Sequence, residues 1–223
     1  MVTIFLVVTI LSYITPLRRN LRGVYKLRQP NRMYKQPIHK DCKMDVTKTD
    51  INNTLANWQA DDVRIRATLG SIGITSPAQL ASMSGQSFFD AMFAGGLPSP
   101  PIGETLDFIP IHIQGGKSIF QGRPSQQHYN PLGSVHGGWF CTILDSAVGC
   151  AIHSTLPAGK GYTTLEIKVN MIRALTKAIP LVRAEANIIH VGRQTATAEG
   201  RIVGPDGKLY AHATTTCLIF DMQ

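Results

Sequence analysis

Cysteine is scarce in this sequence, and its spacing indicates neither a disulfide framework nor a zinc site. The 223 residues include four cysteines, and no two of them form a C-x-x-C pair. A disulfide scaffold or a structural zinc site needs cysteines at short, regular spacings, so both are excluded. We interpret Cys42, Cys141, Cys150 and Cys217 as reduced thiols of a cytoplasmic protein.

Charge is also sparse outside one short segment. Charged residues make up 16% of the chain and the formal net charge is +8. Residues 1–43 hold nine Lys and Arg against the single acid Asp41, whereas residues 44–223 hold 13 basic and 13 acidic residues. The basic character is therefore confined to one end, and we expect no nucleic-acid partner for the remainder. With 43% hydrophobic residues, the chain can bury a core.

The N-terminal apolar run is shorter than a membrane span. Residues 2–14 are apolar, whereas a span needs about 20 residues. A signal peptide has its positive charge before the apolar run, but here Arg18 and Arg19 follow it. Three interpretations are open: a weak membrane anchor through residues 1–15, an amphipathic or partner-binding arm, or translated upstream sequence with Met44 as the true start. We favour the third, because the neutral charge balance begins at Met44.

Three parts are predicted along the chain. Residues 1–43 form a basic and apolar arm, whose second half is typical of a linker or disordered segment. Residues 44–95 carry helical signals, with Asp50 as a cap and with Pro77 at a first helical position after Ser76. A Pro- and Gly-rich stretch over 95–103 then breaks the helices, and residues 96–223 form the main domain.

From the N-terminal segment to the main domain, the spacing of apolar residues changes from 3.6, which is typical of helices, to 2, which is typical of strands. One long helix is expected over residues 135–155. The Gly115-Gly116 pair predicts a hairpin, and the other links are short as well. Such links predict an antiparallel sheet with one helix on its face, which is an α+β fold. Strands are expected over 106–113, 117–122, 165–171, 181–191, 194–203 and 208–220.

The long helix has an unusual polar side. Its residues are small or hydroxylated, where an ordinary exposed face carries Lys, Glu and Arg: Gly138, Thr142, Asp145, Ser146 and Gly149. Taken alone, an Asp in a helix is more often solvated or ion-paired. A single carboxylate among small residues, with no basic residue in the helix, is also suited to act as a general base.

The start of the same helix is a candidate site for binding an oxyanion. Asn130 opens a polar loop that ends in His136-Gly137-Gly138, which places free backbone N–H groups at a helix N-terminus. Such donors stabilise the oxyanion of acyl transfer. Gly137 and Asp145 are separated by roughly 12 Å along the axis. One helix cannot bring both to one carbonyl group, but two subunits could do so.

Three segments of the sequence resemble a known family. They are NPLGSVHGGWFCTILDSAVGCA, GYTTLEIKVNMIR and HVGRQTATAEGRI, and the resemblance extends over about residues 85–220. They resemble hotdog-fold acyl-CoA thioesterases of the phenylacetate-pathway (PaaI) type. The fold that this implies is an antiparallel sheet wrapped around one long central helix, here with extra N-terminal helices.

The resemblance also implies roles for particular residues. Asp145 takes the position of the catalytic acid, as general base or nucleophile, and the Gly137 N–H takes that of the oxyanion donor. Asn130 and His136 match residues that orient the thioester, and Thr163 matches a hydroxyl residue that positions water, although Thr164 beside it leaves this register open. The resemblance also implies a homodimer or homotetramer with active sites at the subunit interface. It implies no metal or prosthetic group.

The expected function is hydrolysis of acyl-CoA to a free acid and coenzyme A. Aromatic and medium-chain acyl groups are both open. A hotdog enoyl-CoA hydratase or dehydratase is the first alternative, although His136 and Asp145 are poorly spaced for the acid–base pair that it needs. A non-catalytic acyl-CoA-binding protein is the second.

Overall fold

A single antiparallel sheet organises the fold. The computed structural model describes residues 47–222. Its strands are β1 (Phe108–Gln114), β2 (Lys117–Gly122), β3 (Lys160–Met171), β4 (Val182–Val191), β5 (Thr195–Val203) and β6 (Leu209–Asp221). They lie in the order β1-β2-β4-β5-β6-β3, and every neighbouring pair is antiparallel. The predicted α+β class and the predicted succession of strands are confirmed.

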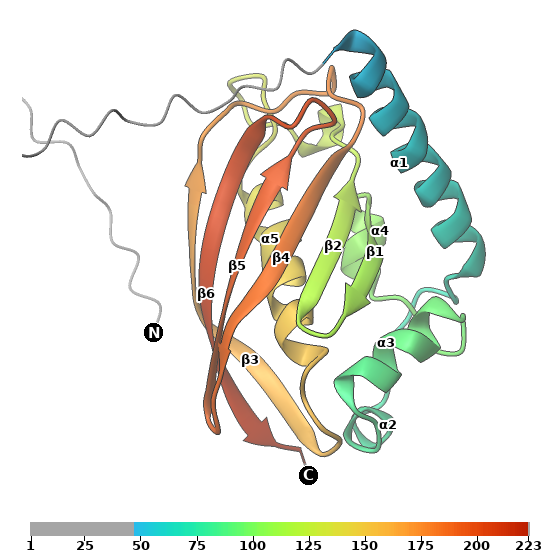
Figure 1. Cartoon of the computed structure of the whole chain (residues 1–223), viewed down its shortest axis with the longest axis vertical. Coiled ribbons are helices and arrows are strands. Elements are labelled where there is room, and N and C mark those ends of the chain that lie inside the picture. The colour runs from blue at the N-terminus through green and yellow to red at the C-terminus, as the bar shows by residue number, and fades with distance from the viewer. Residues whose placement is uncertain (1–46, 223) are drawn as a thin grey trace, which may run out of the picture. The chain divides into compact units, whose positions relative to one another are not determined.

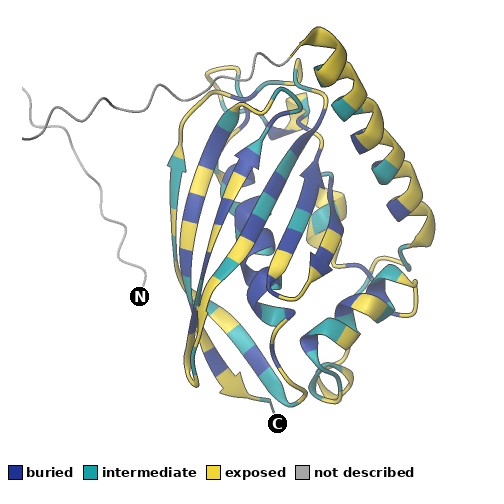
Figure 2. Ribbon diagram, in the orientation of Figure 1, coloured by how far each residue is buried: buried dark blue, intermediate teal, exposed yellow. Residues whose placement is uncertain are grey.

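The long helix α5 (Gly137–His153) lies across one face of the curved sheet (Figure 1). It begins two residues later than predicted, because His136 is the N-cap and its ring nitrogen accepts a hydrogen bond from the Gly138 N–H. The apolar residues on the side of α5 opposite its polar side are all buried, as the dark segments of the helix in Figure 2 indicate. They form one apolar stripe of Phe140, Ile143, Leu144, Ala147, Val148, Ala151 and Ile152. Burial of this stripe fixes which side of α5 stays available for chemistry.

Strand β3 is longer and less regular than predicted. It starts at Lys160 rather than at residue 165, and its register with β6 shifts between Thr164 and Glu166. Of the alternation of apolar residues expected over residues 165–171, the first member is wrong, because Leu165 lies at this bulge, whereas Ile167 and Val169 do pack against the core. Since β3 is an edge strand, Leu165 and Met171 are 60% and 49% exposed.

Four helices precede the sheet: α1 (Lys48–Thr68), α2 (Pro77–Ala81), α3 (Gly85–Phe93) and α4 (Pro101–Thr105). Ser76 caps α2 with Pro77 at its first position, as predicted. The cap of α1 is not Asp50 but Thr47, with which Asp50 forms a reciprocal capping box. Helix α4 begins within the stretch over 95–103 that we expected to break helices, because Pro101 is well suited to a first helical position.

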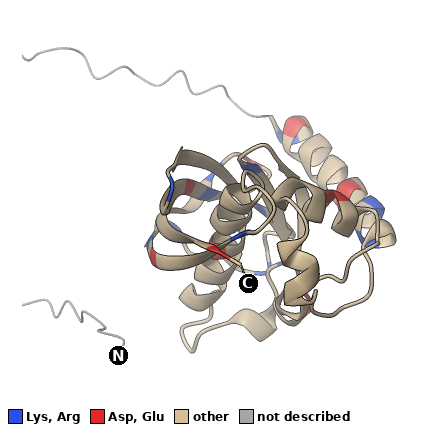
Figure 3. Cartoon of the chain, turned by 90° about the horizontal axis from the view of Figure 1, so that it is seen from below, with Lys and Arg blue, Asp and Glu red and all other residues tan. Residues whose placement is uncertain are grey.

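Polar contacts join α1 to β4 and to Arg123, which follows β2. The buried Asp62 carboxylate accepts hydrogen bonds from Arg66 and Arg123. Arg183 of β4 forms a 2.6 Å ion pair with Asp61 and its guanidinium lies 4.7 Å from the centre of the Trp58 ring. Figure 3 shows that basic (blue) and acidic (red) residues occur together on α1. The charges of this helix are therefore largely paired within the fold.

Some predictions fall on residues that the structure does not describe. The apolar run 2–14, the linker 20–43 and the start at Met44 lie outside residues 47–222. The three-part division of the chain stays a prediction. Among helices of the described part, none is both long enough and apolar enough to cross a membrane.

Candidate functional site

Asp145 stands at the middle of α5, half-buried, on the side that faces β3. The Thr164 hydroxyl on β3 donates a hydrogen bond of 2.9 Å to Oδ1 of Asp145. The same hydroxyl lies 3.9 Å from the Cys217 sulfur on β6. Within residues 47–222, no ion pair involves Asp145. The carboxylate is therefore oriented by a neutral donor rather than neutralised by a cation.

Two buried groups, the Cys150 thiol and the Tyr162 hydroxyl, lie near Asp145. Burial raises the pKa of the Cys150 thiol to about 12, and the negative charge of Asp145 adds to the shift. Burial also raises the pKa of the Tyr162 hydroxyl well above its usual value, with smaller contributions from Cys150 and Asp145. Both groups thus stay protonated near neutral pH. Asp145 is the one acid–base candidate among these three neighbours.

The start of α5 has one backbone donor that is capped and one, the Gly137 N–H, that is not. His136 Nδ1 accepts a 2.8 Å hydrogen bond from the Gly138 N–H. In the described part of the chain, the Gly137 N–H has no hydrogen-bond partner. A Cβ at Gly137 would lie 2.8 Å from the terminal methyl of Met171, so the backbone there is closely approached by a side chain from β3. A free N–H at a helix start can stabilise negative charge on oxygen.

Asn130 is held within its own loop. Its Oδ1 accepts hydrogen bonds from the N–H groups of Leu132 and Ser134, and its Nδ2 lies 3.2 Å from the Ser134 hydroxyl. These contacts shape the turn that leads into α5. In this geometry the Asn130 side chain organises the loop, and its role toward a thioester stays a prediction.

The two neighbouring threonines of β3 lie on opposite sides of the strand. Thr164 contacts Asp145, whereas Thr163, the hydroxyl residue that we predicted, is exposed. Because successive side chains of a strand point to opposite faces, a shift of one residue in register decides which threonine faces Asp145. The role predicted for Thr163 stays a prediction, and Thr164 is the contact that the sequence left open.

The structure thus divides the predicted residues into two groups. Asp145 and Thr164 meet in the middle of α5, whereas Asn130, His136 and Gly137 gather at its start. Eight residues of helix separate Gly137 from Asp145, which is about 12 Å along the axis. One chain does not bring the free N–H and the carboxylate to a common point.

Sequence reasoning missed the aromatic neighbours beyond Asp145. Tyr162 packs against α5 where Gly149 leaves room, since a Cβ at Gly149 would lie 2.7 Å from the Tyr162 hydroxyl oxygen. Gly149 is one helical turn after Asp145, and Tyr162 is two residues before Thr164. The small residue at Gly149 was a usable signal, because a glycine inside a helix indicates that another group comes close.

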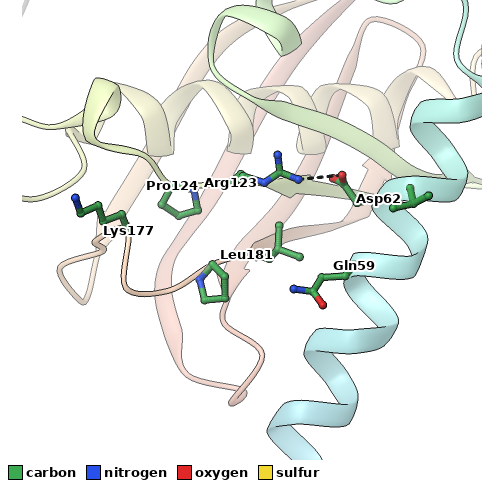
Figure 4. Close-up of a pocket in the computed structure, with 8 residues that line it drawn as sticks. Gln59, Asp62, Arg123, Pro124, Lys177 and Leu181 are labelled. Atoms are coloured by element: carbon green, nitrogen blue, oxygen red, sulfur yellow. Dashed lines mark hydrogen bonds and ion pairs between the residues drawn. The ribbon is translucent and has the colours of Figure 1, made fainter.

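A separate cavity of about 390 Å³ lies beside α1 (Figure 4). Arg123 and Lys177 line it, and Figure 4 shows Arg123 bonded to Asp62 across it. None of the predicted site residues lines this cavity. Within residues 47–222, no group of three or more His, Cys, Asp and Glu side chains is placed to hold a metal ion.

Part of the chain is similar to known proteins. Residues 132–211 match the thioesterase superfamily. A 1,4-dihydroxy-2-naphthoyl-CoA hydrolase of Listeria monocytogenes is 25% identical over 116 residues, which cover 52% of this chain and 93% of the hydrolase. The superfamily match over residues 132–211 includes the whole of α5 and of β3, β4 and β5.

Solved structures give the same result for the fold. A phenylacetic acid degradation-related protein of Ralstonia eutropha JMP134 superposes with a TM-score of 0.54 at 28% identity, covering 59% of this chain and 98% of that one. The conserved protein PA5202 of Pseudomonas aeruginosa gives a TM-score of 0.50 at 27% identity, covering 53% and 93%. These matches cover little more than half of this chain.

Proposed function

Residues 132–211 are a thioesterase-superfamily domain in a chain of hotdog fold, and from this we propose that the protein hydrolyses acyl-CoA thioesters to a free acid and coenzyme A. The observation that carries the proposal is the half-buried Asp145 carboxylate, oriented by Thr164 at 2.9 Å. The name of the Listeria relative supports coenzyme A esters as the substrate class.

In the proposed reaction, Asp145 acts on water at the thioester carbonyl. Its carboxylate takes a proton from water while the water oxygen bonds to the carbonyl carbon. The carbonyl oxygen becomes negatively charged and accepts a hydrogen bond from the Gly137 N–H. The C–S bond then breaks, and the coenzyme A thiolate leaves and takes up the proton. Direct attack by Asp145, with later hydrolysis of the anhydride, gives the same products.

We propose that each active site is shared between two copies of the chain. The distance of about 12 Å along α5 supports this, because Gly137 and Asp145 of one chain cannot reach one carbonyl group. Exposed apolar side chains at the edge strand β3 and just after it, at Leu165, Met171 and Ile172, also favour a partner there. The assembly is a homodimer or homotetramer.

Subunit mixing tests the shared site. Gly137→Pro removes the N–H at the first helical position, which suits proline once the flexible end of Met171 shifts away from the new Cβ. Asp145→Asn removes the base in a second variant. Each variant alone is expected to be nearly inactive. Mixed dimers contain one intact site, so activity returns after the two are unfolded and refolded together. No recovery in a mixture shown to contain mixed dimers contradicts the shared site.

Release of free thiol over a panel of acyl-CoAs tests the function itself. We expect the wild-type protein to hydrolyse aromatic or medium-chain acyl-CoA. We expect the Asp145→Ala variant to release almost no thiol from the same esters. Hydration of enoyl-CoA, followed by absorbance, distinguishes the hydratase alternative. Binding without turnover of any ester in the panel would establish the non-catalytic alternative. A cytoplasmic location stays a prediction from the sequence.

A further inference from the structure

An apolar cavity of about 310 Å³ lies where the N-terminal helices α2 to α4 meet the end of α5 and the start of β3. Residues from several separate parts of the chain surround it. Helix α3 contributes Phe88, Phe89 and Met92, α2 contributes Leu80, and Cys150, His153 and Tyr162 come from α5 and β3. The loops before α2 and around α4 supply Ile74, Thr75 and several prolines.

The chemistry of this cavity is almost purely apolar. No Asp, Glu, Lys or Arg of the described residues lines it. Its rings form one cluster, in which the His153 ring lies 5.2 Å from Phe89 and 5.5 Å from both Phe88 and Tyr162 between centroids. Burial lowers the pKa of His153, so its imidazole is neutral at neutral pH. An apolar group would enter this cavity favourably and a charged group would not.

The cavity lies on the same side of α5 as Asp145, further along the helix and beyond the contact of Tyr162 with Gly149. Asp145, Gly149 and His153 follow one another at four-residue intervals and therefore share one face of α5. On β3, Thr164 contacts Asp145, and Tyr162, two residues earlier on the same face, lies against Gly149 and lines the cavity. Cys150, also in the lining, is about 7.5 Å further along the helix axis than Asp145. The cavity thus begins a few carbon–carbon bonds away from the carboxylate.

From this juxtaposition we propose that the cavity binds the apolar acyl tail of the substrate, with the thioester carbonyl at Asp145 and the tail directed past Tyr162 toward α3. This inference rests on the proposed function. A volume of about 310 Å³ is near the lower end for ligand pockets, which range over about 300–1,000 Å³. It suits an uncharged medium-length or single-ring acyl group, and coenzyme A itself stays outside.

The proposal assigns a function to the segment that precedes the superfamily match. The matched domain covers residues 132–211, whereas Phe88, Met92 and Leu80 lie before it. Side chains of α2 and α3 would then set acyl-chain length, while α5 and β3 supply the chemistry. Acyl selectivity and catalytic residues thus reside in different parts of the chain.

Two variants of opposite effect test this assignment. Leu80→Trp fills the cavity from the half-exposed α2, and Phe88→Ala enlarges it. For each, kcat/KM is measured with acetyl-, hexanoyl-, octanoyl-, dodecanoyl- and benzoyl-CoA. Leu80→Trp is expected to lower the octanoyl-to-acetyl ratio by about 10-fold or more, since one or more methylene groups lose their place. Phe88→Ala is expected to raise the dodecanoyl-to-octanoyl ratio.

Matched controls separate cavity effects from general destabilisation. Phe93→Ala removes the same side chain from the same helix, but Phe93 packs toward Ile65, Ile109 and Ile111 and does not line the cavity. Ile189→Trp adds the same ring at a 57% exposed position outside the lining. Both controls are expected to keep the wild-type chain-length profile, and thermal unfolding confirms that each variant is folded.

The possible outcomes are distinct. If wild-type protein hydrolyses acyl-CoAs and folded Leu80→Trp keeps the wild-type ratios, the acyl-tail site is wrong while the proposed function stands. Equal changes in the Phe93→Ala control contradict the site as well. If wild-type protein releases thiol from none of the esters, both the function and the site are overturned.

Discussion

The Thr164 hydroxyl donates a 2.9 Å hydrogen bond to Oδ1 of Asp145, which connects the edge strand β3 to the middle of the central helix. A hydrogen bond to a charged acceptor is worth about 1.5–3 kcal/mol. It fixes one carboxylate oxygen and leaves Oδ2 for a proton from water. Thr164 is therefore a positioning residue in this account, and Asp145 is the catalytic one.

Thr164→Val keeps the shape of the side chain and removes the donor. We expect kcat to fall by about 10-fold or more, with a much smaller change in KM, because the carboxylate loses its orientation. Thr164→Ser restores the hydroxyl and should recover most of the activity. Thr163→Val is the matched control, since Thr163 is exposed on the other side of the strand. Equal losses in both valine variants would contradict the role of Thr164.

Gly149 is expected to be intolerant of a side chain. A Cβ there would lie 2.7 Å from the Tyr162 hydroxyl oxygen, and such overpacking costs about 1–3 kcal/mol, offset in part by the better helix propensity of alanine. Gly149→Ala should thus lower the free energy of unfolding, measured with urea. Adding Tyr162→Phe removes the oxygen but keeps the ring carbon at 2.9 Å, so the double variant should be somewhat more stable than the sum of the single effects predicts. Strict additivity would argue against this contact.

We expect the buried His153 to make the stability of the fold depend on pH. Burial lowers its pKa in the folded state, so between that value and the unfolded value of about 6.5 the unfolded chain binds more protons. The free energy of unfolding should therefore fall as the pH falls below about 6.5. His153→Phe keeps a ring beside Phe88, Phe89 and Tyr162 and should reduce this slope in urea titrations between pH 5 and 7.

A second histidine provides the comparison for that slope. Burial also lowers the pKa of His128, against an opposing effect of Asp107, so some pH dependence should persist in His153→Phe. The same titration on His128→Phe separates the two contributions. An unchanged slope in His153→Phe would show that His153 is not the group responsible.

The fold was largely predictable because its signals are local. Strict alternation and the Gly115-Gly116 pair predict the strands and a hairpin, and the apolar stripe of α5 predicts the buried face. The sheet-edge bulge that exposes Leu165 has no such signal, since it depends on pairing with β6. Thr47 was missed as a cap because Asp50 is also a capping residue type.

The site was predictable only in part. Asp145 and Gly137 are recognisable from the composition of one helix. The choice between Thr163 and Thr164 depends on one residue of strand register, which short patterns do not fix. The cavity at Phe88 and His153 joins residues more than 60 positions apart, so only the packing of α3 against α5 reveals it.

The most direct test of the account is kcat of Asp145→Asn with the best acyl-CoA found for the wild-type protein. Asparagine keeps the size of the side chain but cannot accept the proton, so kcat should fall by about 10²–10⁴-fold. Thermal unfolding should remain close to that of the wild type, which shows that the fold is intact. Turnover by Asp145→Asn at nearly the wild-type rate would contradict the central claim that this carboxylate performs the chemistry.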